Sequence, residues 1–155
     1  KEDLKMHFYN LIKELSENRK LILYVDMDGV LACFDVGNPK DYLKKRPLYQ
    51  SIQIFEKIND LPNVELQILS ICKEDFQIKE KEKWLDLYAP FFTKRNILSK
   101  EHLGNITSAN LKADYLNSVS SSSQIALIDD DNEVLKMVHK KVPHILLYQD
   151  SELID

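Results

Sequence analysis

Two aspartates one residue apart, Asp26 and Asp28, follow directly on the apolar run LILYV. Two neighbouring carboxylates at the end of a strand repel each other unless a positive charge lies close to them. A hard divalent cation such as Mg²⁺ is the natural partner, because it binds carboxylate oxygens and takes its other ligands from water and phosphate. Gly29, which follows, allows a tight turn beside a ligand. This stretch therefore predicts a magnesium site.

Other polar groups stand next to the later apolar runs. Ser70 directly follows the second run, and Asp129 and Asp130 directly follow the fourth. Lys112 opens the helical pattern that precedes the fourth run. Because ligands of parallel α/β sheets bind beyond the carboxyl ends of the strands, we expect all these groups at one edge. A magnesium ion with a lysine beside it predicts a phosphoryl group as the ligand.

Strand and helix patterns alternate along the chain. Short apolar runs predict strands over 20–25, 64–69, 95–98, 124–128 and 144–148. Apolar residues at helical spacing predict helices over 3–17, 50–60, 75–89, 109–119 and 131–141. This alternation predicts a Rossmann-like α/β fold, with a mostly parallel sheet and helices on both faces. We expect one domain of 155 residues, with a core over 20–30 and 50–150 and a small cap insertion over about 31–49.

The spacing of Asp26 and Asp28 suits a two-step reaction. With extended backbone at Asp26 and a turn at Gly29, both carboxylates can reach one centre from different sides. One carboxylate can attack phosphorus and form a covalent intermediate. The other can give a proton to the leaving group and later take one from water.

Four segments resemble, in order, the motifs of the haloacid dehalogenase (HAD) superfamily of aspartate-nucleophile phosphatases. They are DMDGVLACF, LQILS, the lysine of NLKADYL, and ALIDDD, and the resemblance spans residues 21–147. A single DxD is a weak match, whereas four motifs in the expected order are specific. DMDGVLACF and the paired aspartates of the fourth motif look most like the 5′(3′)-deoxyribonucleotidases and their bacterial relatives. The helical segment KEKWL, which follows the second motif, also resembles that group.

The resemblance implies a metal site made by three aspartates. Asp26 would be the nucleophile and a Mg²⁺ ligand. Asp28 would be the general acid and base, and would give its backbone carbonyl to the metal. Asp129 would be the third protein ligand of the ion. Charge stabilisation in such a site is usually the largest contribution to catalysis.

The resemblance also implies which residues hold the phosphoryl group and the rest of the substrate. Ser70 would donate a hydrogen bond to a phosphoryl oxygen, and Lys112 would neutralise the phosphoryl group and the aspartyl-phosphate. Asp130 would support Lys112 or a metal-bound water. Phe34 matches the phenylalanine that stacks on the base in those nucleotidases.

The cap that closes over the base in those nucleotidases is short here. We expect one short helix around Pro39 to Pro47, with Tyr42 and Tyr49 available to help Phe34 bind the substrate. A small cap leaves the site open. It therefore weakens the case for strict nucleotide specificity.

Ordinary structural roles compete at several positions. Lys100 is an alternative to Lys112 as the phosphoryl-binding lysine. Asp131 is expected to cap the following helix rather than bind metal. Trp84 is expected to pack in the core. The basic run Lys44–Arg46 is interpreted as a solvated surface.

The predicted function is Mg²⁺-dependent hydrolysis of phosphomonoesters through an aspartyl-phosphate. Nucleoside monophosphates, including deoxynucleoside monophosphates, are the expected substrates. The alternatives are a HAD phosphatase acting on another small phosphate ester, and a receiver-like regulatory domain that binds phosphate without turnover.

Composition excludes some other classes of partner. The formal net charge is -4, which favours neither polymeric nucleic acid nor a membrane surface. No apolar run approaches 18 residues, so no membrane span is expected. The two cysteines, Cys33 and Cys72, do not form a disulfide framework and favour a reducing, cytoplasmic setting.

Overall fold

A five-stranded parallel sheet forms the centre of the protein. The computed structural model describes residues 6–34, 41–119 and 123–154. The strands are β1 (Leu21–Val25), β2 (Val64–Cys72), β3 (Lys94–Ser99), β4 (Gln124–Asp129) and β5 (Leu146–Gln149). Their order across the sheet is β3-β2-β1-β4-β5, and all neighbours pair in parallel. The predicted α/β fold with a parallel sheet is therefore confirmed.

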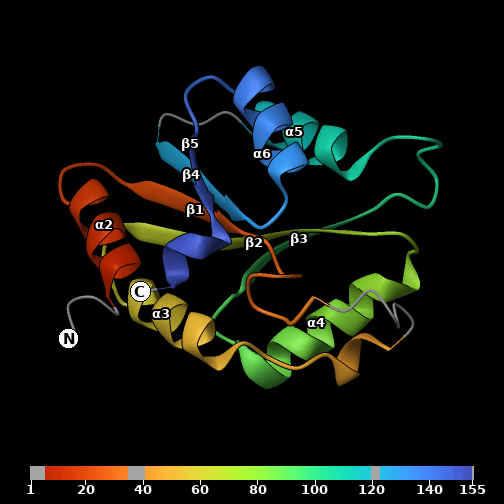
Figure 1. The fold of residues 1–155 in the computed structure, drawn as a ribbon, viewed down its shortest axis with the longest axis horizontal. Helices are drawn as coiled ribbons and strands as arrows, with labels where there is room; N and C mark the ends of the chain where they lie inside the picture. Colours follow the sequence, from red (N-terminus) through yellow and green to blue (C-terminus); the bar gives the residue numbers. More distant parts are fainter. Residues whose placement is uncertain (1–5, 35–40, 120–122, 155) are drawn as a thin grey trace.

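Helices cover both faces of this sheet (Figure 1). On one face lie α2 (His7–Leu15), α3 (Tyr49–Asn59) and α4 (Phe76–Tyr88), and on the other lie α5 (Ser108–Ser118) and α6 (Asn132–Lys141). The chain moves outward from β1 to β3 through α3 and α4, then returns to the other side of β1 through α5 and α6. Because crossovers between parallel strands are right-handed, the two directions of travel place their helices on opposite faces.

The central strand β1 is buried on both sides, which explains its continuous apolar sequence. Leu21, Leu23 and Val25 belong to the apolar cluster that also contains residues of α2, α3 and α4. Ile22 and Tyr24 point the other way and join the cluster under α5 and α6. Full burial of each such aliphatic side chain stabilises the fold by about 1.5–3 kcal/mol.

A short segment that follows β1 packs against α4. It contains the 3-10 helix η1 (Tyr42–Lys44). The indole of Trp84 donates a hydrogen bond to the carbonyl of Lys45 at 3.0 Å, and the Tyr42 and Trp84 rings meet edge to face with centroids 6.0 Å apart. A short helix is therefore found within the range predicted for the cap, whereas Pro39 lies outside the described residues. The role of this segment as a cap stays a prediction.

Several element boundaries differ from the sequence prediction. The helix predicted over 3–17 spans His7–Leu15 where the structure describes it. Strand β2 continues through Ser70 to Cys72, because Ile71 and Cys72 still pair with β3. A 3-10 helix, η2 (Asp150–Leu153), was not predicted. No helix in the described part of the chain is long and apolar enough to span a membrane.

Candidate active site at the carboxyl edge of the sheet

The register of the sheet brings the carboxyl ends of β1, β2 and β4 together. Val25 at the end of β1 is level with Ile68 of β2 and Ile128 of β4. The backbone amide of Asp26 donates a hydrogen bond to the Ile128 carbonyl at 3.1 Å. Since the chain departs to opposite sides of β1, the topological switch point lies between β1 and β4, where ligands of such sheets bind.

Three carboxylates and one lysine meet at this switch point. Asp26, Asp129 and Asp130 each place a carboxylate oxygen within 4.8 Å of the others. The ammonium of Lys112 donates hydrogen bonds to Asp26 Oδ1 at 2.8 Å and to Asp129 Oδ2 at 2.6 Å. Asp26, Asp129 and Lys112 are all buried. We call Asp26, Asp129, Asp130 and Lys112 the acidic end.

Burial and mutual repulsion shift the titration of the acidic end. Burial raises the pKa of Asp26 well above its usual range, and the charge of Asp129 adds to the rise while Lys112 opposes it. Burial, with a further contribution from Asp129, raises the pKa of Asp130 to about 6. Burial disfavours the charged form of Lys112, but the two neighbouring carboxylates outweigh it and raise the pKa of Lys112.

The donor set of the acidic end fits a hard divalent cation. With all groups ionised, three carboxylates against one ammonium leave two negative charges without a partner. All the available metal ligands are oxygens, which Mg²⁺ prefers. Asp26, Asp129 and Asp130 would hold the ion, and Lys112 would remain as the organic cation of the site. Asp130, expected only in a supporting role, thus joins the ligand group, and the expected ligation by the backbone carbonyl of Asp28 stays a prediction.

Gly29 is required by this geometry. Its φ is +83°, in the left-handed region, so the predicted tight turn is confirmed. A Cβ atom at this position would lie 1.9 Å from Asp130 Oδ2. Only glycine therefore allows Asp130 to reach the acidic end.

The second predicted carboxylate, Asp28, is bound by two lysines. Its Oδ1 accepts a hydrogen bond from Lys45 Nζ at 2.8 Å, and its Oδ2 accepts one from Lys81 Nζ at 3.2 Å. Lys81 also donates to Ser70 Oγ at 2.6 Å and to the carbonyl of Ile71 at 2.9 Å. Lys81 therefore connects two predicted site residues that do not otherwise share a hydrogen-bond partner among the described residues.

Tyr42 completes the surroundings of Asp28. Its ring lies 5.0 Å from Lys45 Nζ and 5.2 Å from Lys81 Nζ, measured to the ring centroid. Its hydroxyl is buried and near Asp28, but it makes no hydrogen bond of ordinary geometry among the described residues. Burial, and after it the nearby charge of Asp28, raises the pKa of Tyr42 well above its usual range. We call Lys45, Lys81 and Tyr42 the lysine cradle.

The cradle keeps Asp28 ionised. Burial alone would raise the pKa of Asp28, but the charges and hydrogen bonds of Lys81 and Lys45 outweigh burial and lower it. As it lies in this structure, Asp28 is an acceptor. It has to leave the two lysines before it can serve as the predicted general acid.

The two cradle lysines were not predicted from the sequence. Lys45 was interpreted as part of a solvated surface, and this is wrong, because its side chain is only 10% exposed and pairs with Asp28. Lys81 is buried on the inner stripe of α4 together with Trp84 and Leu85. Two signals were available for Lys81. It lies at i, i+3, i+4 spacing with buried apolar residues, and it begins KEKWL, the segment that resembles the nucleotidases.

Several predicted roles are corrected by the structure. Lys112 is the fifth residue of α5, about one turn after the start of the helix, where it had been expected. Its hydrogen bonds go to Asp26 and Asp129, so the expected support of Lys112 by Asp130 is not found among the described residues. Lys100 lines a surface pocket with Glu101, and no residue of the acidic end belongs to that lining.

The aromatic residues divide between surface and core. Phe34 and Tyr49 are exposed, at 61% and 62%, and Phe34 lies 6.0 Å from Lys45 Nζ by its ring centroid. Tyr42 is buried, so it is not free to stack on a substrate as suggested. Trp84 is fully buried, which confirms its predicted packing role.

The predicted helix cap at Asp131 is also confirmed. Its Oδ1 accepts a hydrogen bond from the backbone amide of Glu133 at 2.9 Å, at the start of α6. The Asp129 carboxylate in turn accepts from the Asp131 amide at 2.9 Å. Asp131 therefore stabilises the helix and helps orient a residue of the acidic end.

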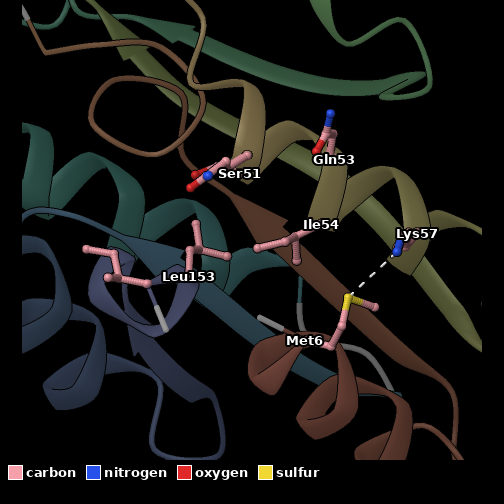
Figure 2. Close-up of a pocket in the computed structure, with 8 residues that line it drawn as sticks. Met6, Ser51, Gln53, Ile54, Lys57 and Leu153 are labelled. Carbon is pink, nitrogen blue, oxygen red and sulfur yellow. Dashed lines mark hydrogen bonds between the residues drawn. The ribbon is translucent and has the colours of Figure 1, made fainter. Parts of the chain in front are cut away.

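A surface pocket between α2, α3 and η2 lies apart from this chemistry (Figure 2). Its lining contains no carboxylate, and its Lys57 Nζ lies 3.8 Å from Met6 Sδ. An adjoining pocket shares Gln50 and Leu153 with it and extends to Gly29. Of these two pockets, only the second reaches the edge where the acidic end lies.

A second group of metal-binding residue types lies on the surface. Asp75, Glu101 and His102 are all exposed. The Nε2 atom of His102 lies 3.1 Å from Asp75 Oδ2 and 3.0 Å from Glu101 Oε2, so these groups satisfy one another. The acidic end, in which Asp26 and Asp129 are buried, is the stronger candidate.

Comparison with known proteins establishes the fold and nothing finer. No protein-family model matches this sequence, and no curated protein matches it. Two solved structures are similar, "Structure of Pnkp1/Rnl/Hen1 complex" at a TM-score of 0.67 and "Structure of the Pnkp1/Rnl/Hen1 RNA repair complex" at 0.64, each at 16% identity. Each match covers 86% of this chain but only 46% and 44% of the other chain. At this identity the likeness supports the Rossmann-like α/β architecture alone.

Proposed function

We propose that this protein is a Mg²⁺-dependent phosphomonoester hydrolase of the HAD type that works through an aspartyl-phosphate. The observation that carries this proposal is the opposite charge of two neighbouring clusters at one sheet edge. With all groups ionised, the acidic end has two unbalanced negative charges, whereas the cradle places two ammonium groups around one carboxylate. A divalent cation beside a phosphate group would balance both.

In this proposal the acidic end supplies the metal and the nucleophile. Asp26, Asp129 and Asp130 would bind Mg²⁺, which would polarise the phosphoryl oxygens. A carboxylate oxygen of Asp26 attacks phosphorus and forms a bond to it as the bond from phosphorus to the leaving oxygen breaks. Lys112, which already bonds Asp26, offsets the negative charge that builds on the phosphoryl oxygens.

Proton transfer would fall to Asp28. Once protonated, Asp28 gives its proton to the leaving oxygen, which departs as an alcohol. Asp28 then takes a proton from a water molecule that attacks the aspartyl-phosphate, and phosphate leaves while Asp26 regains its carboxylate. Ser70, which is buried in β2 and bonded to Lys81, orients a phosphoryl oxygen.

Nucleoside monophosphates are the first substrate class in this proposal. The exposed ring of Phe34, near Lys45, offers a surface for a base. A phosphate at an RNA end is a second candidate, because one structural neighbour belongs to an RNA repair complex. Two free cysteines fit a reducing compartment such as the cytoplasm, which stays a proposal.

A phosphate-release panel tests this function. The panel compares nucleoside and deoxynucleoside monophosphates, sugar phosphates and short oligonucleotides with a 3′- or 5′-phosphate, each with Mg²⁺ and with EDTA. We expect release that needs Mg²⁺ and is lost in Asp26→Asn. No release from any ester, together with an acyl-phosphate that persists for minutes after treatment with a phosphodonor, would favour the receiver-like alternative.

A further inference from the structure

We propose that the lysine cradle is a phosphate-binding site, and that the Asp28 carboxylate occupies it when no ligand is bound. The inference rests on the proposed function and deepens it. It adds Lys45, Lys81 and Tyr42 as residues that contact the transferred phosphoryl group. Lys45 and Tyr42 lie outside every segment that resembles the superfamily, and Lys81 begins KEKWL, for which the resemblance implied no role.

The cradle holds more hydrogen-bond donors than Asp28 uses. Lys81 directs its three N–H groups to Ser70, Ile71 and Asp28, but the one hydrogen bond that Lys45 Nζ makes among the described residues goes to Asp28. The Tyr42 hydroxyl is buried and lies near Asp28, but it makes no hydrogen bond of ordinary geometry among the same residues. The flat carboxylate of Asp28, held by two lysines, therefore satisfies this hydroxyl poorly. A tetrahedral phosphate has three terminal oxygens and can accept from Lys45, Lys81 and Tyr42 together.

The charge of the cradle also favours a dianion over a carboxylate. Lys45 and Lys81 have side chains only 10% and 4% exposed, and they share one carboxylate partner. Buried charge that lacks a partner is costly. The dianion of a phosphate monoester would match both ammonium groups, whereas Asp28 matches one.

The position of the cradle places its ligand in the proposed reaction. Lys81 bonds the hydroxyl of Ser70 on β2, and β2 is the direct neighbour of β1, which leads into Asp26. A phosphate that replaces Asp28 in the cradle therefore lies at the same edge as the nucleophile. Its arrival would release Asp28 from the two lysines.

The test is binding of inorganic phosphate to the metal-free protein, measured by calorimetry in EDTA. Asp28→Asn should bind phosphate at least about fivefold more tightly than wild type, because the competing carboxylate is gone. Lys45→Gln and Lys81→Gln should bind at least about tenfold more weakly, since each loses a charge-assisted hydrogen bond. Tyr42→Phe should weaken binding by about threefold with little change in thermal stability, because the hydroxyl that it removes makes no hydrogen bond of ordinary geometry.

A matched lysine variant serves as the control. Lys141 pairs with Asp114 on the surface of α5 and α6, so Lys141→Gln changes the charge equally and should leave phosphate binding as in wild type. Misfolding cannot explain the gain expected in Asp28→Asn, and Lys45→Gln decides the question if Lys81→Gln fails to fold. Unchanged or weaker binding by Asp28→Asn would overturn the proposal, as would undetectable binding in that variant.

The result separates the cradle from the proposed function. If the protein hydrolyses no ester but shows this pattern of phosphate binding, the proposed function is rejected and the phosphate-binding role of the cradle is supported. If the protein hydrolyses esters with Mg²⁺, but wild type and every cradle variant bind phosphate equally well, only the phosphate-binding role of the cradle is rejected.

Discussion

The acidic end and the lysine cradle with its Asp28 are built from the same two charged residue types in opposite proportions. The acidic end has three aspartates for one lysine, and the cradle has two lysines for one aspartate. Both are largely buried, and both lie where β1 and its neighbours end. The difference shows that this edge of the sheet is polarised, with an excess of carboxylates in one cluster and an excess of ammonium groups in the other.

This polarity explains why neither cluster is balanced alone. Unpartnered buried charges cost free energy, so each cluster on its own reduces the stability of the ligand-free protein. A metal ion would relieve the acidic end, and a phosphate group would relieve the cradle. Substitutions that change one cluster and leave the other intact therefore test the contrast between them.

The largest effect is expected from Asp26→Asn. We expect turnover to fall by at least about 10³-fold, because the amide cannot attack phosphorus. The thermal midpoint of the metal-free protein should not fall, since asparagine keeps the shape and removes one unbalanced charge. Steady-state kinetics and thermal melting measure the two outcomes.

Asp131→Asn is the matched control for that variant. It makes the same chemical change close to the acidic end, but Asp131 caps α6, and asparagine caps a helix about equally well. We expect near wild-type turnover in Asp131→Asn. If Asp26→Asn kept more than about a tenth of wild-type turnover, Asp26 would not be the nucleophile.

The next largest effect is expected from Gly29→Ala, whose new side chain would collide with Asp130 of the acidic end. The new Cβ would meet Asp130 Oδ2 at 1.9 Å, on a backbone with φ of +83°. We expect a loss of about 2–4 kcal/mol in the free energy of unfolding, from backbone strain and overpacking together. Urea denaturation measures it.

Gly104→Ala separates strain from contact. Gly104 also has a positive φ, +67°, but a Cβ atom added there would meet nothing within 4 Å. Strain alone should cost about 1–2 kcal/mol there. Equal losses in the two variants would mean that the approach of Gly29 to Asp130 contributes nothing.

Magnesium binding gives a somewhat smaller effect on stability. At about a hundredfold excess over its Kd, Mg²⁺ should stabilise the wild type by about 2.7 kcal/mol, which corresponds to roughly 5–10 °C in thermal midpoint. Asp129→Asn should lose most of this shift, whereas Lys45→Gln in the cradle should keep it. A shift of equal size in Asp129→Asn would place the ion somewhere other than the acidic end.

Sequence patterns predicted the acidic end because its members follow from topology. Asp26 and Asp129 each come at the end of an apolar strand, and parallel strands that are neighbours must end at the same edge. Lys112 required only that its helix lie beside that edge. The sheet and the helices themselves were predictable for the same reason, to within a few residues at their ends.

The cradle could not be predicted in this way, because it depends on tertiary packing. Lys45 lies in irregular backbone whose position is set by contacts with α4, including the hydrogen bond from Trp84 to the Lys45 carbonyl. Lys81 points inward only because the inner stripe of α4 packs over the segment that follows β1. Neither contact can be inferred from the local sequence. The local sequence also does not indicate that β2 continues past Ser70, where Ile71 and Cys72 pair with β3.

The smallest effect is expected at a third cluster, which has the same two-lysine, one-carboxylate composition as the cradle but lies in water. Glu65 accepts from Lys20 at 3.3 Å and from Lys94 at 2.8 Å, and these two lysine side chains are 55% and 57% exposed. Its neighbours, chiefly a hydrogen bond from Lys94, lower the pKa of Glu65 to about 2. Water and salt screen such pairs, so Glu65→Gln should cost only about 0.5–1 kcal/mol at pH 7.

The pH dependence of Glu65→Gln tests whether burial is what distinguishes the cradle. Because the pKa of Glu65 is lower in the folded protein than its ordinary value of 4.5, the unfolded chain binds the proton first as pH falls. The stabilisation by Glu65 is therefore complete above about pH 4.5 and is lost progressively toward pH 2. Urea denaturation of wild type and Glu65→Gln at pH 7 and pH 3 should show the difference shrinking, and added salt should shrink it at pH 7 as well. A difference at pH 7 that resists salt would mean that two exposed lysines hold a carboxylate as firmly as two buried ones do, and burial would no longer explain why the cradle keeps its excess charge.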